Sequence, residues 1–283
     1  SYCSIPSIRG SYRSVPMEEL IKEAEFLAAN YVKELILVAQ ETTVYGVDLY
    51  GKKSLVELVE KLSGIEGIEW IRLMYCYPEE IDDDLINLIK NNRKVCHYLD
   101  IPIQHASDRI LQKMGRRTSK KDIVSLIKKL RKEIPDISLR TSLITGFPTE
   151  SEEEAEELLK FVKDIKFDRL GVFTYSKEEN TLAASFKPQI KESVKKQRQK
   201  AIMEAQREIS LKRNKSFISK EVEVIIEGYN TEEGFYTARM YADAPDIDGC
   251  VFIESDENYL SGTFLKVRIT DCSEYDLIGE IIS

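Results

Sequence analysis

The sequence predicts an α/β fold in two parts. An open, partial TIM-like (β/α)6 barrel that lacks its first strand is followed by a small antiparallel β-barrel. Between residues 17 and 213, helical patterns alternate with short apolar runs, which is typical of βα units around a parallel sheet. After residue 213, short strands are separated by turn residues, which is typical of a small antiparallel barrel. We expect one domain over residues 1–188, a linking helix over 189–213 and a second domain over 214–283.

Five strands and six helices are expected in the first domain. The strands cover 35–38, 70–75, 97–101, 137–144 and 169–175, and the helices cover 17–30, 55–62, 82–90, 107–114, 119–133 and 151–164. Asp82 and Ser151 stand where N-caps belong, and Glu154 completes a capping box with Ser151. Because the chain opens in a loop before its first helix, we expect a strand ahead of that helix to be missing.

The linking helix is strongly basic, and the second domain is rich in short strands. These strands cover 222–226, 235–240, 251–253, 264–269 and 277–282, with Gly228, Gly234, Gly249 and Gly262 as turn residues between or beside them.

Composition excludes several classes of protein. The longest apolar runs fall short of 18 residues, and the first residues carry neither the charged start nor the apolar core of a secretion signal, so we expect a cytoplasmic protein without a membrane partner. The five cysteines are scattered, with no C-x-x-C pair, which argues against a disulfide framework and a complete zinc site. The two histidines are too few for a metal held mainly by imidazoles.

The charge is concentrated in the C-terminal quarter. Residues 214–283 contain five basic and fifteen acidic residues, a net charge of −10, whereas the whole chain carries −8. A contiguous anionic domain repels a phosphate backbone and favours a basic partner. The alternative interpretation is that the acids only keep a small domain soluble.

Four of the expected strands carry polar residues within them or at the end where parallel strands place their ligands. They are Gln40, Glu41, Thr42 and Thr43 after the first strand, Gln104, His105 and Ser107 after the third, Ser138, Arg140 and Thr141 within the fourth, which ends at Gly146, and Tyr175 and Ser176 at the end of the fifth. Each alone is explained by a helix cap or a satisfied core amide. Together they predict a ligand at the carboxyl edge of the sheet.

Arg140 and Gly146 carry further expectations. The apolar neighbours of Arg140 predict that its side chain points into the barrel, where a carboxylate from Glu41, Asp100 or a ligand must pair with it. Gly146 permits a close approach of the backbone to a ligand, and a plain turn explains it equally well.

The first ten residues resemble the end of a known motif. Ser1 to Gly10 read SYCSIPSIRG, which is similar to the end of C-x-x-x-C-(S/T)-Y-C-x-I-P-x-x-R-G in radical S-adenosylmethionine (SAM) methylthiotransferases. In that family three cysteines ligate a 4Fe-4S cluster and leave one iron open to S-adenosylmethionine. Cys3 matches the third cysteine. The other two would lie ahead of residue 1.

The resemblance extends over most of the chain. Residues 39–51, 101–108, 139–150 and 172–179 match segments of the same family and indicate its RimO-type branch, which methylthiolates an aspartate of a small-subunit ribosomal protein. The C-terminal barrel resembles a TRAM domain, and residues 243–249 are similar to the RimO-type form. The rival is the MiaB-type branch, which modifies an adenosine of transfer RNA. The anionic barrel favours a basic ribosomal protein, free or in the assembled subunit, over RNA.

The resemblance implies roles for named residues. Cys3 is implied as a cluster ligand, and Gln40, Glu41 and Thr42 as the segment that receives the methionine amino group of S-adenosylmethionine. Gln104, Ser107 and Arg140 are implied as partners of its carboxylate and ribose. Gly146 is implied as a neighbour of the adenine, and Tyr175 as a further cofactor contact. Tyr45, His105, Asp243, Asp246 and Asp248 are expected to bind the substrate. Thr149 departs from the glycine that the family has there, which predicts a stiffer loop.

The resemblance also implies the chemistry. A reduced cluster cleaves S-adenosylmethionine to a radical that removes hydrogen from the unactivated β-carbon of the aspartate, which a side-chain base could not do. Sulfur delivery would depend on a second cluster in an N-terminal domain. We expect this chain alone to lack both clusters and to be inactive. A purely protein-docking module without a cofactor remains the alternative from a different class.

Overall fold

A five-stranded parallel sheet forms the centre of the first domain. The computed structural model describes residues 1–282. The strands are β1 (Glu34–Leu37), β2 (Trp70–Leu73), β3 (Val95–Asp100), β4 (Ser138–Thr145) and β5 (Arg169–Thr174). They pair in the order β1-β2-β3-β4-β5, and every pairing is parallel. All five expected strands and the open, partial barrel are confirmed.

The six expected helices are present, together with short ones that were not expected. The expected helices are α2 (Met17–Ala29), α4 (Leu55–Ser63), α5 (Asp83–Asn91), α6 (Asp108–Met114), α7 (Lys120–Glu133) and α8 (Glu152–Ile165). The additional elements are α1 (Ile5–Arg9), α3 (Val47–Tyr50), the 3-10 helix η1 (Pro78–Glu80) and α9 (Leu182–Ser185). Asp82 caps α5, and Ser151 with Glu154 forms the predicted capping box of α8.

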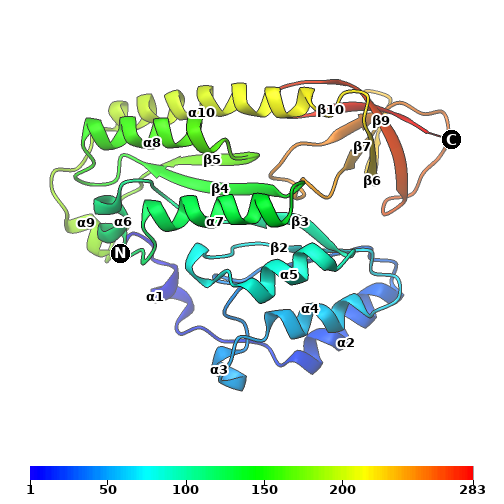
Figure 1. Ribbon diagram of the computed structural model, residues 1–283, viewed down its shortest axis with the longest axis horizontal. Helices are drawn as coiled ribbons and strands as arrows, with labels where there is room; N and C mark the ends of the chain where they lie inside the picture. The colour runs from blue at the N-terminus through cyan, green and yellow to red at the C-terminus, as the bar shows by residue number, and fades with distance from the viewer. Residues whose placement is uncertain (283) are drawn as a thin grey trace.

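The basic helix α10 (Glu192–Lys215) is part of the first domain's packing as well as a connection. It lies along α8 over the β5 side of the sheet, as Figure 1 shows. Ile202 is buried in the main apolar core, and the side-chain amide of Gln206 donates to the carbonyl of Phe167 at 2.9 Å. The helix is therefore anchored to the sheet over most of its length.

The C-terminal residues form a closed five-stranded barrel. Its strands are β6 (Glu221–Asn230), β7 (Phe235–Arg239), β8 (Val251–Ile253), β9 (Phe264–Cys272) and β10 (Leu277–Ile281), in the order β10-β8-β7-β6-β9. Four of its five strand pairings are antiparallel, as expected, and the fifth, between β10 and β8, is parallel. This pairing closes the barrel, since the last strand must lie beside β8 on one side and β9 on the other.

One face of the parallel sheet packs on helices and the other is concave. In β4, Leu139 and Leu143 are buried in the core shared with the helices, whereas Arg140, Ser142 and Ile144 alternate with them and are less buried. Because successive side chains of a strand point to opposite faces, these three residues face the concave side.

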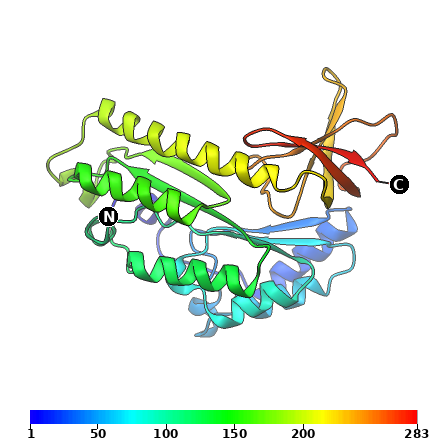
Figure 2. The same cartoon turned by 45° about the horizontal axis from the view of Figure 1, so that its top comes forward.

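The two ends of the sheet have different neighbours. The N-terminus, α6 and α9 lie at one end and the β-barrel at the other, in both Figure 1 and Figure 2. Trp70, at the start of β2, meets Phe264 of the barrel edge to face, with ring centroids 4.9 Å apart. The β-barrel therefore covers the end where the strands begin, and the carboxyl edge of the sheet is at the opposite end. Over residues 1–282, no helix is both long and apolar enough to cross a membrane.

Candidate functional site

The loops after β1 and β2 are joined by Glu41 and Thr42. The Thr42 hydroxyl donates to the carbonyl of Met74 at 2.6 Å, and the Glu41 carboxylate accepts from the backbone N–H of Tyr77 at 3.1 Å. The pKa of Glu41 is raised, because the effect of burial exceeds that of the hydrogen bonds from Thr43 and Tyr77, which lower the pKa. Gln40, by contrast, is exposed. The segment is thus a rigid rim on the carboxyl edge with one exposed polar side chain.

Arg140 forms the ion pair with a carboxylate that its apolar sequence neighbours predict. Its Nη1 donates to Asp100 Oδ1 at 2.8 Å, so Asp100 is the partner among the candidates considered from the sequence. A second partner, Asp248, comes from the β-barrel and lies 3.5 Å from Arg140 Nε. No local feature of the sequence predicted this second ion pair, because Asp248 lies far along the chain from Arg140.

Gln104 closes the gap between β3 and β4. Its backbone N–H donates to Ser142 and its carbonyl accepts from Ile144, at 2.9 and 2.8 Å. Gln104 has a φ of 71°, a left-handed conformation that re-aims its half-buried side chain. Within residues 1–282 the side-chain amide makes no hydrogen bond, so it is available to a ligand at the carboxyl edge.

His105 is a structural residue, which corrects its expected role in substrate binding. Its side chain is 0% exposed; Nδ1 accepts from the backbone N–H of Ser107 at 2.9 Å, and Nε2 lies 3.1 Å from Glu150. Glu150 in turn pairs with Arg198 of α10 at 2.8 Å. This buried chain joins the loops after β3 and β4 to α10 and leaves His105 no surface for a macromolecule.

Ser107 and Tyr45, which were expected to contact the cofactor and the substrate, both form hydrogen bonds within the protein. The Ser107 hydroxyl caps α6 and donates to Glu154 at 2.7 Å. Tyr45 is buried, and its hydroxyl donates to the carbonyl of Val15 at 2.8 Å, so Tyr45 offers no surface to a protein substrate in this conformation. The expected substrate role of Tyr45 is therefore wrong for the structure as it stands.

The close approach expected between Gly146 and a ligand is instead made to Lys195 of α10 in the same chain. The φ of Gly146 is 71°, and a β-carbon built there would lie 2.3 Å from Lys195 Cγ of α10. Lys195 is buried, and its Nζ donates to the carbonyl of Tyr175 at 2.6 Å. The need for glycine at this position therefore follows from Lys195, and contact with an adenine stays a prediction.

Thr149, nearby, occupies a left-handed conformation with a φ of 75°. Such a conformation is strained for a β-branched residue. The Thr149 carbonyl accepts from Arg109 Nη2 at 2.7 Å, and its hydroxyl accepts from Lys113 at 2.7 Å. These contacts hold the loop in the conformation that a glycine would adopt without strain.

Cys3 is exposed at the same edge of the sheet. Tyr2 packs into an apolar cluster with Phe147 and Tyr175, and the carbonyl of Ser1 accepts from the N–H of Ala183 at 3.0 Å. These contacts fix the N-terminal segment beside the ends of β4 and β5. Among residues 1–282, the buried hydroxyl of Tyr175 has no hydrogen-bond partner, which leaves one donor unused at this edge.

One thiolate does not hold an iron–sulfur cluster. In the described part of the chain, no group of three or more His, Cys, Asp and Glu side chains is arranged to bind a metal. Cys76 and Cys96 are buried in two different apolar clusters, and the Cys250 thiol hydrogen-bonds to Asp276 in the β-barrel domain. Cys3 fits the role of one ligand, and residues 1–282 do not supply the others.

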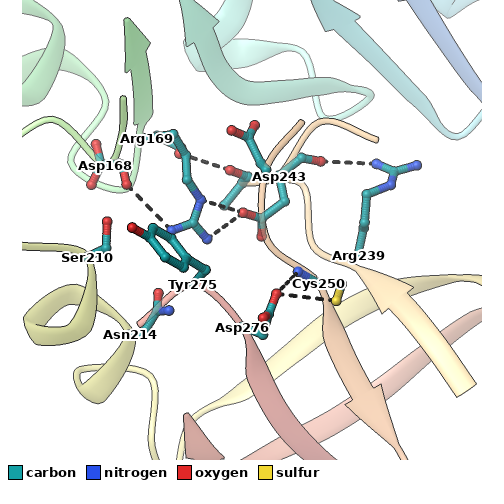
Figure 3. A network of polar contacts seen from close by, with 12 residues as sticks. Asp168, Arg169, Ser210, Asn214, Arg239, Asp243, Cys250, Tyr275 and Asp276 are labelled. Atoms are coloured by element: carbon teal, nitrogen blue, oxygen red, sulfur yellow. Dashed lines mark hydrogen bonds and ion pairs between the residues drawn. The ribbon is translucent and has the colours of Figure 1, made fainter. Parts of the chain in front are cut away.

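The expected acidic docking face is largely an interface inside the molecule. Asp243 is 1% exposed and accepts from Arg169 Nε of β5 at 2.7 Å, and its carbonyl accepts from Arg239 at 3.1 Å (Figure 3). The Asp248 side chain is 2% exposed and pairs with Arg140. Only Asp246 of the three is exposed. The docking role expected for Asp243 and Asp248 is wrong, because both carboxylates neutralise arginines of the parallel sheet.

Lys195 and Arg198 were missed because their helix was interpreted as a basic linker. Their spacing with Ile202 and Gln206 is helical, so the four share one face, and that face includes an apolar residue. Ile202, an apolar residue on this face of a charged helix, was the feature of the sequence that could have indicated packing of the face on the sheet.

Comparisons with known proteins agree with this architecture. The radical SAM superfamily profile matches residues 1–162, and the TRAM domain profile matches residues 218–282. The chain is 60% identical over 279 residues to the ribosomal protein uS12 methylthiotransferase RimO of Lachnoclostridium phytofermentans, and 57% identical over 283 residues to that of Acetivibrio thermocellus. The matches cover 99% and 100% of this chain.

The chain spans less than two thirds of these relatives, 63% and 62% of their lengths. Among solved structures, Streptococcus suis SuiB bound to S-adenosylmethionine aligns with a TM-score of 0.47 and 15% identity, over 69% of this chain and 41% of that one. The superfamily match extends over more than half of the chain and includes Cys3 and the first four strands of the sheet. The chain therefore belongs to the radical SAM superfamily.

Proposed function

We propose that this chain is the S-adenosylmethionine-binding domain and the C-terminal domain of a RimO-type methylthiotransferase, which adds a methylthio group to an aspartate of ribosomal protein uS12. The observation that carries the proposal is Cys3. It stands in SYCSIPSIRG, is exposed, and lies beside Phe147 and Tyr175 at the carboxyl edge of the parallel sheet. The high identity to proteins named RimO supports the same activity.

The proposed cofactor site lies on the concave side of the carboxyl edge. Cys3 is the proposed cluster ligand. Arg140 and Gln104 are the proposed partners of the S-adenosylmethionine carboxylate and ribose, because a guanidinium and an unbonded amide suit those groups. The segment Gln40–Thr42 is proposed to receive the amino group. Ser107, Gly146 and Tyr175 remain proposed neighbours of the cofactor, with the Ser107 hydroxyl shared with Glu154.

The chain's own contribution is to bind and orient. A 4Fe-4S cluster with S-adenosylmethionine supplies the radical chemistry. Around it, the rim formed by Glu41 and Thr42 is held by hydrogen bonds, and the apolar cluster of Tyr2, Phe147 and Tyr175 is proposed to exclude water from the side on which Cys3 lies. A dry pocket protects a reactive radical from side reactions.

The proposed partner is a basic protein of the small ribosomal subunit, in the cytoplasm. The C-terminal domain carries a net charge of −10, and although Asp243 and Asp248 are used internally, most of its other acids remain exposed. A surface of this sign suits a lysine- and arginine-rich protein.

The test is reconstitution of the full-length protein under reducing conditions with S-adenosylmethionine. We expect 5′-deoxyadenosine to form, and mass spectrometry to detect a methylthio group on an aspartate of uS12, supplied either free or in the small subunit. Cys3→Ala should abolish both products. Modification of transfer RNA instead of uS12 would favour the MiaB-type activity, and an inert wild-type protein with its cluster in place would contradict the enzymatic proposal.

A further inference from the structure

The outer surface of the β-barrel carries apolar residues on three adjacent strands, β7, β8 and β10. Alternate residues of these strands form the barrel core: Tyr236 and Ala238 of β7, Val251 and Ile253 of β8, and Leu277 of β10. Because successive side chains of a strand point to opposite faces, the residues next to them face outward. Three of these outward residues are large and apolar, namely Phe235, Phe252 and Ile278. We call these three residues the outer apolar patch.

The three residues of the outer apolar patch are contiguous. Ile278 pairs in register with Phe252 between the parallel strands β10 and β8. The rings of Phe252 and Phe235 meet edge to face, with their centroids 4.7 Å apart. Ile278 is 44% exposed, and both phenylalanines are half-buried. A single exposed apolar side chain is ordinary on a protein surface, whereas a contiguous group is typical of an interaction site.

The outer apolar patch lies on the part of the β-barrel that points away from the first domain. The first domain contacts the barrel through the loop 240–249 and through Phe264 of β9. At the end of β7, Arg239 pairs with Glu34 of the parallel sheet, and Phe235 is at the opposite end of the same strand. Within residues 1–282, these contacts between the domains therefore leave the patch uncovered.

Acidic residues form a rim around the outer apolar patch. The rim consists of five exposed acids: Glu232 and Glu233 in the turn before Phe235, Glu254 after β8, Asp271 opposite Ile278 in β9, and Glu280 in β10. Within residues 1–282, only Glu280 of the five has an ion-pair partner, Arg268 at 3.5 Å, and Arg268 also pairs with Glu221. The rim is therefore strongly anionic. An apolar centre with a polar rim is the usual anatomy of a protein–protein interface.

We infer that the outer apolar patch and its acidic rim are a docking site for a lysine- and arginine-rich segment of the protein substrate. This inference rests on the proposed function, which makes a basic protein the partner. The acidic rim repels the phosphates of a nucleic acid and attracts cationic side chains. A lysine or arginine drawn to the rim can also lie over the exposed faces of Phe235 and Phe252, which attract cations.

The docking site is remote from the proposed reaction centre. The β-barrel lies at the end of the parallel sheet where the strands begin, and Cys3 lies at the opposite, carboxyl edge, as Figures 1 and 2 show for the barrel and the N-terminus. A substrate reaches both places only if it extends along the molecule. The docking site therefore strengthens the binding of whole uS12 and contributes nothing to the binding of a short peptide around the target aspartate.

The experiment measures binding and methylthiolation of uS12 by the reconstituted full-length protein. We expect Ile278→Thr, which keeps a β-branched residue in the strand, to weaken uS12 binding and to raise the KM for uS12 about tenfold, with kcat unchanged. The KM for a short peptide around the target aspartate should stay within about twofold of wild type. An equal rise of the KM for the peptide would contradict the inference, because structural damage then explains both.

Leu260→Thr is the matched control for the apolar residue. Leu260 is 82% exposed and belongs to the same domain, but it lines a cavity between the barrel and the first domain together with Lys33 and Trp70. This variant should leave the KM for uS12 within about twofold of wild type. Equal effects of Ile278→Thr and Leu260→Thr would overturn the inference, since any loss of apolar surface would then be sufficient.

A second pair of variants tests the acidic rim. Glu254→Gln should weaken uS12 binding about threefold at low ionic strength and less at high salt, because salt screens exposed charges. Glu223, which is also exposed, lines a cavity with Arg93 on the side of the first domain, so Glu223→Gln should leave binding unchanged. Equal weakening by both variants would contradict the inference, because the net charge of the domain then explains it.

Two other occupants of the patch would produce different results, and either result overturns the inference. If Ile278→Thr lowers the thermal unfolding midpoint of the full-length protein without changing uS12 binding, a segment outside residues 1–283 covers the patch. If the variant converts a dimer into a monomer in light scattering, a second copy of the chain covers it. A wild-type protein that modifies uS12 while Ile278→Thr binds it normally refutes the docking site alone. A wild-type holoprotein that neither binds nor modifies uS12 refutes the proposed function, and the docking site with it.

Discussion

Lys195 packs its aliphatic chain on the α-carbon of Gly146. The two residues are far apart in sequence, yet Lys195 Cγ occupies the space of a β-carbon at residue 146, and Nζ continues to the carbonyl of Tyr175. A helix from the end of the first domain thereby fixes the loop that follows β4. The conformation of the carboxyl edge depends on α10 as much as on the strands.

Gly146→Ala should destabilise the protein. A side chain at this φ costs about 1–2 kcal/mol, and overpacking against Lys195 adds about 1–3 kcal/mol, so we expect a loss of at least about 2 kcal/mol in the free energy of unfolding. Urea denaturation measures it. Adding Lys195→Ala should recover part of the loss by opening space.

Gly228→Ala is the control for this prediction. A β-carbon there meets no atom within 4 Å and the backbone needs no left-handed conformation, so a change of less than about 1 kcal/mol is expected. Equal losses at both glycines would show that Lys195 is not the cause.

The ion pair between Arg169 and Asp243 should show strong coupling. Each single variant, Arg169→Met or Asp243→Ala, leaves one buried charge without its partner and should lower the free energy of unfolding by about 3 kcal/mol. The double variant should lose clearly less than the sum, because no uncompensated charge remains. Strictly additive losses in denaturation experiments would mean that the two residues do not interact.

Thiol labelling should follow exposure. Cys3 is exposed, whereas Cys76 and Cys96 are buried, and burial raises the pKa of Cys96 to about 12. Because the thiolate is the reactive form, a brief iodoacetamide pulse on the native protein should modify Cys3 well before Cys76 and Cys96, as peptide mass spectrometry will reveal. In denaturant the difference should disappear. Early labelling of Cys96 in native buffer would contradict the structure.

Glu154 should contribute to stability only above acidic pH. Burial alone would raise its pKa, but hydrogen bonds from Arg109, Ser151 and Ser107 outweigh it and lower the pKa to about 2. The unfolded chain takes up this proton near the ordinary value of 4.5, so the stabilisation is present above that pH and is lost as the pH falls toward 2.

The measurement compares wild type with Glu154→Gln by urea unfolding at several pH values. The stability difference should be largest near neutrality and should shrink below pH 4.5. Glu156→Gln, at an exposed position of the same helix, provides the matched control for replacing a helix carboxylate by an amide. A difference that is independent of pH would contradict the assigned hydrogen bonds.

Local signals in the sequence predicted most of the secondary structure. The capping box of Ser151 and Glu154 lies within four residues and marked the start of α8 correctly, and each apolar run became a strand. Such features depend on neighbours along the chain, so the sequence alone is sufficient to identify them.

The placement of charges was harder to predict. Asp243 lies 74 residues from Arg169, and the acidity of its domain was interpreted as a surface for a partner. A charge count cannot tell an acid that faces solvent from one that neutralises a buried arginine of another domain. The same limit applies to His105, whose partner Glu150 becomes adjacent only when β3 and β4 pair.

The edge-to-face contact of Trp70 with Phe264 gives the molecule a built-in optical reporter. The chain has a single tryptophan, and it lies at the seam between the parallel sheet and the β-barrel. Its indole is buried there, so separation of the two lobes would transfer it to water and shift its emission to longer wavelength. Intrinsic fluorescence therefore monitors the contact between the parallel sheet and the β-barrel without an added label. It distinguishes simultaneous unfolding of both domains from an earlier detachment of the β-barrel.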